Sequence, residues 1–431
     1  MITTTSYAPG EPNAVLDRIR SRAVDMNPAM IARVSAIIER VRAEGDDALI
    51  AFTKQFDNVD LRIQDLRVDP DFIRVTAKAA ARPVIEAFRI AIDNVRSFHE
   101  RQREPGFSIA RGRSVVGQRI LPIASAGLYV PGGRAAYPST VVMCAVPAQV
   151  AGVKRIAIAT PPGTLQQTPA VAAVINELGI EEVYRVGGAH AIAALAFGTA
   201  TVPRVDKIVG PGNAYVAIAK KLVFGTVGID SIAGPTEVVV IADHNADPRF
   251  VAADLLAQAE HDEAASSICI TTDPGVASEV AREVERQIAT LERRAIAAAS
   301  IERYGAVFVV ESIEAACELS NLIAPEHLEL MTEDNDRAAN LIENAGAIFF
   351  GEYSSEPVGD YIAGPNHVLP TLGTARFSSA LGVYDFVKRQ SIIRYDREAS
   401  LAGAEAIATM AEAEGLTAHQ RAVLRRKGEG G

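Results

Sequence analysis

The sequence predicts an α/β protein with parallel sheets, organised as two α/β units. Between residues 129 and 242, short β-branched runs alternate with glycine-rich turns and alanine-rich stretches, which is the pattern of parallel strands joined by crossover helices. Residues 248–350 show a second such alternation without being a repeat of the first. The chain of 431 residues is also longer than one hydrophobic core usually supports. We therefore expect two lobes with a cleft between them.

The elements follow in chain order. The first hundred residues carry apolar stripes at helical spacing, such as Val34, Ile38 and Val41, and are expected to form scaffold helices. A helix is predicted at 250–261, and strands are predicted at 156–159, 183–186, 207–209, 237–241, 268–271, 306–310 and 347–350. Residues 351–382 are polar and irregular, as functional loops and linkers are. A helix at about 400–414 precedes a short last helix, whose first turn contains His419.

Composition narrows the class of protein. Lys and Arg number 43 and Asp and Glu 53, so the net charge is −10, which argues against nucleic acid as the main partner. The first residues lack the features of a signal peptide, and no apolar run reaches membrane-spanning length, so we expect a cytoplasmic protein. Three cysteines are too few and too scattered for a disulfide framework or a thiolate zinc site.

Three glycine-rich turns lie where predicted strands should end, at 130–133, 186–191 and 209–215. Ligands of open α/β sheets gather at C-terminal strand ends, where a helix N-terminus can receive a phosphate. A nucleotide cofactor is therefore expected. None of the turns contains the usual G-x-G-x-x-G fingerprint, so each taken alone is more typical of a plain connection.

Glu326 and His327 place a carboxylate directly beside an imidazole, after a helix-breaking proline. Such a pair suits an enzyme that moves two different protons in one pocket, because the environment can separate the two pKa values. The alternative interpretation is a surface turn with ordinary charges.

A second group of residues suggests a metal site. Gln258 and His261 are three apart on a predicted helix, Asp360 lies in the irregular segment, and Glu414 and His419 flank a turn. Imidazole, amide and carboxylate donors without thiolate suit zinc, with manganese or cobalt as substitutes. A polar helix end, a self-capping aspartate and a helix–helix turn explain the same residues without a metal.

Taken together, these residues resemble the histidinol dehydrogenase family. Nearly the whole chain is covered, by collinear segments at 127–133 (GLYVPGG), 137–140 (YPST), 207–216 (KIVGPGNAYV), 233–237 (AGPTE), 258–261 (QAEH), 324–330 (APEHLEL), 364–371 (GPNHVLPT) and 414–419 (EGLTAH). The family is zinc- and NAD-dependent and oxidises L-histidinol to L-histidine through L-histidinal, the last step of histidine biosynthesis.

The resemblance implies roles for individual residues. His327 would take the alcohol proton, and Glu326 would activate water at the aldehyde stage. One zinc per subunit would orient the substrate and be held by Gln258, His261, Asp360 and His419. The substrate would be contacted by these four ligands together with Thr236, His327, His367 and Glu414.

NAD would contact Tyr129, His190 and Asn213. The family commonly has glutamine where this chain has His190. Because an imidazole titrates near neutrality, we expect weaker or more pH-dependent cofactor binding.

The family's fold implies two incomplete Rossmann-like α/β domains with small terminal helical extensions, assembled as an intertwined homodimer. Residues 1–25 would be an N-terminal extension packing in the dimer. Residues 26–128 and 237–380 would form the domain with the zinc and catalytic residues, and 129–236 would bind NAD. Residues 381–431 would be a dimerisation segment that brings Glu414 and His419 into the partner's active site.

Three alternatives remain open. A paralogous dehydrogenase of another polar alcohol, such as a sulfonated diol, would share the catalytic pair and the metal ligands. A zinc hydrolase would use Glu326 as base and turn over without NAD. A non-catalytic ligand-binding module is the third, and it does not explain so many polar site residues in one chain.

Overall fold

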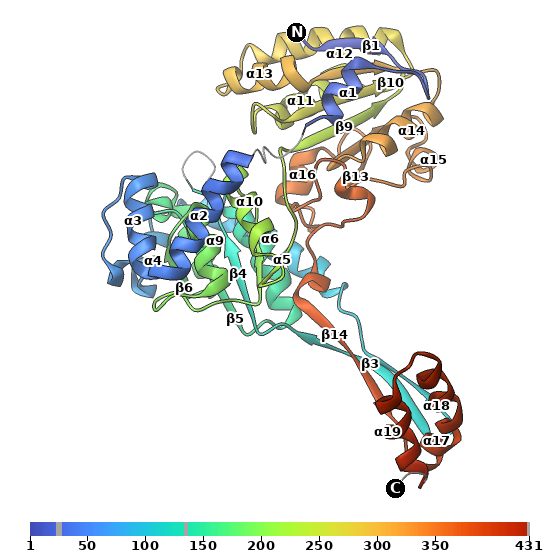
Figure 1. The fold of residues 1–431 in the computed structure, drawn as a ribbon. Coiled ribbons are helices and arrows are strands. Elements are labelled where there is room, and N and C mark those ends of the chain that lie inside the picture. The colour runs from blue at the N-terminus through green and yellow to red at the C-terminus, as the bar shows by residue number, and fades with distance from the viewer. Residues whose placement is uncertain (23–27, 133–136, 429–431) are drawn as a thin grey trace. The chain divides into compact units, whose positions relative to one another are not determined.

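The structure is a computed structural model that describes residues 1–22, 28–132 and 137–428. It divides into two compact units, Met1–Gln102 with Ala124–Phe386 and Arg103–Ile123 with Val387–Gly431. The first unit contains two parallel sheets covered by helices, so the α/β prediction is confirmed (Figure 1). Gly133 of the first glycine-rich turn, residues 23–25 of the expected N-terminal extension and the final residues 429–431 lie outside the described residues.

A six-stranded sheet contains the second predicted α/β unit, and all its strands are parallel. Its order is β1 (Thr3–Ser6), β11 (Ala306–Val309), β10 (Ser266–Thr271), β9 (Glu237–Ala242), β12 (His327–Met331) and β13 (Ala347–Phe350). The helices around it are α1 (Ala14–Arg20), α11 (Pro248–Ala259), α12 (Pro274–Ile288), α13 (Arg294–Tyr304), α14 (Ile313–Ile323), α15 (Asn335–Ala339) and α16 (Glu356–Tyr361). Val238 and Val240 face a core shared with α11, α12 and α13, whereas Val239 and Ile241 face one shared with α1 and α14.

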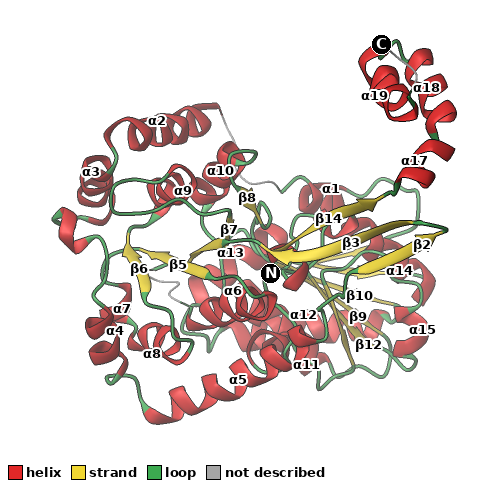
Figure 2. Ribbon diagram, turned by 90° about the horizontal axis from the view of Figure 1, so that it is seen from below, coloured by secondary structure: helices red, strands yellow, loops and turns green. Residues whose placement is uncertain are grey.

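A five-stranded parallel sheet contains the first predicted unit except for its last strand, 237–241, which belongs to the six-stranded sheet instead (Figure 2). Its order is β6 (Glu182–Arg185), β5 (Arg155–Thr160), β4 (Ser125–Tyr129), β7 (Lys207–Val209) and β8 (Gly228–Ile229). The helices between its strands are α6 (Pro138–Ala151), α7 (Thr164–Gln167), α8 (Pro169–Glu177), α9 (Gly188–Phe197) and α10 (Ala214–Val223). The strand order reverses between β4 and β7, which makes their carboxyl ends the switch point where ligands of such sheets bind.

The N-terminal helices are α2 (Pro28–Glu44), α3 (Asp46–Asp57), α4 (Pro70–Ala77) and α5 (Arg82–Glu100), and they pack on the helices of the five-stranded sheet. Val34 and Leu49 share a core with Tyr129 and Ile192, so the expected grouping of residues 26–128 with 237–380 is corrected. An apolar stripe shows that a helix buries one face, but it does not show which sheet receives it. The first residues also differ from the expected extension, because β1 pairs with β11.

The second unit is small. Strands β2 (Phe107–Arg111), β3 (Ser114–Pro122) and β14 (Val387–Arg394) form an antiparallel sheet, and the chain continues into α17 (Arg397–Ala402), α18 (Ala404–Ala413) and α19 (Thr417–Lys427). The helix predicted at 400–414 is therefore divided at Gly403, and His419 lies in the first turn of the last helix as predicted. None of the described helices combines the length and apolar character that a membrane crossing requires.

Candidate active site

Glu326 and His327 lie at the start of β12, next to the central strand β9. Helix α14 is capped by Ala324 in the left-handed conformation, and Pro325 then leads into the strand. The two side chains are only 7% and 3% exposed, so the surface-turn interpretation is wrong. They lie at the amino ends of β9 and β12, opposite to the edge where ligands of open α/β sheets usually gather. At the amino end of a strand the first backbone N–H groups are free to donate hydrogen bonds, and a carboxylate can accept them.

The backbone of Glu237 orients both catalytic side chains. Its N–H donates to Oε2 of Glu326 at 3.0 Å, and its carbonyl lies 3.2 Å from Nδ1 of His327. A carbonyl only accepts, so Nδ1 carries the proton and Nε2 keeps a lone pair. Within the described residues, this buried Nε2 has no hydrogen-bond partner. His327 is thus held in the tautomer that a general base requires.

Burial moves the pKa values of the pair in opposite directions. It raises the pKa of Glu326 to about 8 and lowers the pKa of His327. A carboxylate with a raised pKa is a stronger base than an ordinary one, and an imidazole with a lowered pKa is neutral and ready to accept a proton. The arrangement therefore suits two separate proton transfers.

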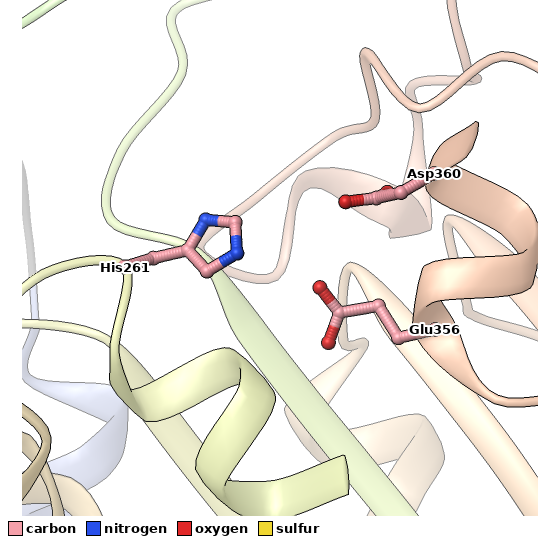
Figure 3. A group of neighbouring side chains, drawn as sticks. All are labelled: His261, Glu356 and Asp360. Carbon is pink, nitrogen blue, oxygen red and sulfur yellow. The ribbon is translucent and has the colours of Figure 1, made fainter. Parts of the chain in front are cut away.

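Three side chains from two segments converge on one point. Ligand atoms of His261, Glu356 and Asp360 all lie within 4.8 Å of one another (Figure 3). The helix that carries Gln258 ends at Ala259, so His261 lies in the turn just beyond it rather than on the predicted helix. Asp360 lies on the short helix α16, within the segment predicted to be irregular. These nitrogen and oxygen donors fit a divalent metal such as zinc.

A group of buried carboxyl groups surrounds this point. Asp254 and Glu329 pack against Glu356, whose N–H donates to Oε1 of Glu329 at 2.8 Å. Burial and neighbouring carboxylates raise the pKa of Glu356 well above its ordinary value. Placing several carboxylates together in a site shielded from water costs free energy unless a cation balances their charge. The donor set therefore fits the metal implied by the resemblance.

A cavity of about 170 Å³ brings six of the predicted catalytic, metal and substrate residues together. Its lining includes Thr236, His261, Glu326, His327, Asp360 and His367. Gln258 is fully buried and contacts the hydroxyl of Thr236, which also contacts Oε2 of Glu326. Nδ1 of His367 donates to the carbonyl of Asp360 at 3.0 Å, which leaves its Nε2 as an acceptor. Glu414 and His419 belong to the second unit, where both side chains are exposed beside the turn between α18 and α19.

Two of the predicted NAD residues lie at the switch point of the five-stranded sheet. Tyr129 ends β4, and its hydroxyl accepts from the N–H of Gly188 at 3.0 Å. Asn213 caps α10 by accepting from the N–H of Val216, which leaves its exposed amide nitrogen for a ligand. Gly210 has φ 114°, and a Cβ there would lie 2.3 Å from the Tyr129 carbonyl, so the turn requires glycine.

His190 is placed differently from the expectation. Its ring packs against Phe52 and Phe56 of α3 and is 1% exposed, and neither ring nitrogen has a hydrogen-bond partner in the described part of the chain. Burial lowers the pKa of His190 to about 4. The imidazole therefore stays neutral near pH 7, and the expected titration near neutrality is wrong. A contact with NAD stays a prediction.

Acidification is expected to destabilise the protein through His190. Because its folded pKa lies below the ordinary value, the unfolded chain binds the proton first, so the contribution to stability is present above about pH 6.5 and lost as the pH falls toward 4. Between pH 6.5 and 5 the loss should be about 2 kcal/mol. Urea unfolding followed by circular dichroism measures it. His190→Gln should remove this part of the pH dependence, and the exposed His244→Gln should keep it.

Sequence reasoning missed three residues of the site. Glu356 belongs to the converging cluster, and Glu237 orients the catalytic pair. Arg22 forms a buried ion pair with Glu237 and donates to the Ala264 carbonyl at 3.2 Å, so it anchors the start of β9. In the sequence each is a single charged residue with no distinctive spacing, and only the burial of its carboxylate or guanidinium group distinguishes it.

Comparisons with known proteins agree over nearly the whole chain. A family model described as histidinol dehydrogenase matches residues 20–427. The histidinol dehydrogenase of Halalkalibacterium halodurans is 54% identical over 392 residues, covering 90% of this chain and 92% of that protein. The histidinol dehydrogenase of a Synechococcus strain is 50% identical over 423 residues, covering 97% of each. A crystal structure of histidinol dehydrogenase from Elizabethkingia anophelis superposes with a TM-score of 0.92 at 38% identity, covering 99% of this chain and 98% of that one.

Proposed function

Because the chain belongs to the histidinol dehydrogenase family and is therefore an oxidoreductase, we propose that it oxidises L-histidinol to L-histidine through L-histidinal. This is the last step of histidine biosynthesis. One water and two NAD are consumed, and two NADH and three protons are released with the carboxylate product. The observation that carries the proposal is the free Nε2 of buried His327, which shares a cavity with Glu326 and the converging cluster of His261, Glu356 and Asp360.

His327 serves the first oxidation. Its Nε2 takes the hydroxyl proton of the alcohol while a hydride leaves the carbon for the nicotinamide. The imidazolium formed is stabilised because Nδ1–H already donates to the Glu237 carbonyl. No reorientation of the ring is needed, because strand β12 and the β9 backbone fix it.

Glu326 serves the second oxidation. Its carboxylate takes a proton from the water that attacks the carbonyl carbon of the aldehyde, and the hydrated species then gives up the second hydride. The N–H of Glu237 donates to Oε2 and holds it in place. Because the two bases lie on adjacent residues, the substrate can stay in one position through both steps.

Gln258, His261 and Asp360, with His419, would hold a zinc ion that orients the substrate through its imidazole and amine. Manganese or cobalt would suit the same donors. His367, Thr236 and Glu414 would add substrate contacts.

Tyr129, His190 and Asn213 would contact NAD, and residues 129–236 would then be the cofactor-binding domain. Residues 381–431 would complete the partner's active site in a homodimer. Histidine biosynthesis by such an enzyme would take place in the cytoplasm.

The stoichiometry of NADH tests the proposal. Purified enzyme supplied with L-histidinol and excess NAD is expected to form two NADH per histidinol, with histidine as the product. Absence of NADH formation would contradict histidinol as the substrate and favour a paralogue acting on another polar alcohol, such as a sulfonated diol. Turnover in the absence of NAD would favour the zinc hydrolase instead.

A further inference from the structure

We propose that Glu356 is a positioning residue for the metal site, whose carboxylate fixes the orientation of the Gln258 amide. This inference rests on the proposed function, in which the oxygen of Gln258 binds the metal. Glu356 would act through Gln258 rather than as a ligand of its own.

The hydrogen bonds around Gln258 assign its orientation. One terminal atom of the amide contacts the Thr236 hydroxyl, and the other lies 2.5 and 3.0 Å from the two carboxylate oxygens of Glu356. The positive charge of the proposed metal would keep the Glu356 carboxyl group ionised despite its burial, and an ionised carboxylate only accepts hydrogen bonds, so the atom facing Glu356 is the NH₂ group. The oxygen of Gln258 then accepts from the Thr236 hydroxyl, and its second lone pair remains available to bind a cation.

Glu356 is itself held firmly. It is the first residue of α16, is almost fully buried, and donates its N–H to Oε1 of Glu329 on β12. Asp360 lies four residues later on α16, so both carboxylates project from one face of the helix. A single turn of helix thus supplies one expected ligand and the group that orients another. Such supporting contacts around a metal ligand set its geometry and affinity.

The converging cluster is also compatible with Glu356 as a direct ligand, because its carboxylate lies within 4.8 Å of donor atoms of His261 and Asp360. However, both of its oxygens are already within hydrogen-bonding distance of the Gln258 nitrogen. The two roles predict different energetics. If Glu356 acts by positioning Gln258, substituting Glu356 should not weaken zinc binding further once Gln258 has been removed. If Glu356 is a direct ligand, its substitution should weaken zinc binding even without Gln258.

The positioning role of Glu356 is tested by measuring the zinc affinity of the full-length protein in competition with a chelator. No activity measurement is needed. Glu356→Gln is expected to weaken zinc binding roughly 10- to 100-fold, because an amide both donates and accepts and no longer dictates the orientation of Gln258. Gln258→Leu should weaken binding at least as much, and Gln258→Leu combined with Glu356→Gln should bind no more weakly than Gln258→Leu alone. Glu352→Gln is the matched control. Glu352 accepts from the N–H of Asp247, and glutamine retains that acceptor, so zinc affinity should not change.

Two results would overturn the inference. One is wild-type zinc affinity in Glu356→Gln, and the other is a double variant weakened by the product of the two single effects, as a direct ligand requires. If Glu356→Gln fails to fold, Glu356→Asp replaces it, since it keeps the charge but withdraws the carboxylate by one methylene; wild-type affinity there would equally refute the role. A wild-type protein that binds no zinc, or a Gln258→Leu variant with unchanged affinity, would instead refute the proposed metal site.

Discussion

Replacing His327 with glutamine is expected to lower the rate of histidinol oxidation by about 10²- to 10⁴-fold, the range that a general base contributes. Glutamine preserves much of the shape of the side chain but has no basic nitrogen to take the alcohol proton. Replacing Glu326 with glutamine should act on the other half of the reaction. That variant still accepts the N–H of Glu237, yet it cannot take a proton from water, so oxidation of histidinal should slow by a similar factor.

Both variants are measured on histidinol and on histidinal. In a single turnover with histidinol, Glu326→Gln should release close to one NADH per site and accumulate the aldehyde, whereas His327→Gln should release almost none. Thermal unfolding of each variant checks that the fold is retained. Equal activity of the two variants on histidinal would contradict the division of labour between the two residues.

Mixing inactive variants is expected to restore activity if the active site is shared between chains. The residues that line the catalytic cavity come from the first unit, whereas Glu414 and His419 lie exposed in the second. In a heterodimer of Glu326→Gln and His419→Asn chains, one site would combine both defects and the other would be intact. Statistical exchange of subunits in a two-fold dimer should therefore recover about a quarter of wild-type activity.

A matched control uses two substitutions within the same unit. Mixing Glu326→Gln with His261→Asn, which removes a residue of the converging cluster in the same unit, leaves every site with one defect, so no activity should return. Tagged heterodimers can be purified to show that subunits have exchanged. If verified heterodimers of Glu326→Gln and His419→Asn stay inactive, the shared site is refuted.

Much of the fold follows from local sequence, because runs such as 238–241 are β-branched and buried on both faces. Strand β12 has a weaker signal in the sequence, since Glu329 interrupts its apolar residues and Pro325 precedes it. The polar residues of β12 are explained only by their contacts in the fold: His327 with the Glu237 carbonyl, and Glu329 with the N–H of Glu356. The N-terminal β1 is short and rich in threonine, and it becomes a strand because the edge of β11 is available to it. Pairing of that kind depends on residues far away in the chain.

The site shows the same limit. Family resemblance identified Gln258, His261 and Asp360, and the structure brings their segments together. Glu356 carries no local signal, because an acidic residue after a serine in a polar segment is ordinary. Its role arises from contacts with β12 and α11, which no spacing along the chain reveals. For His190 the residue type alone predicts titration near neutrality. Its burial against Phe52 and Phe56 lowers the pKa instead.

The support that Glu237 gives to the catalytic pair has a consequence for genetics. Both contacts are made by main-chain atoms, so exchanging the side chain at 237 leaves the N–H and the carbonyl in place. A conventional alanine scan would therefore report only the ion pair with Arg22 and overlook the scaffold of the active site. Proline, which lacks the N–H, or an ester bond introduced by chemical synthesis would expose it.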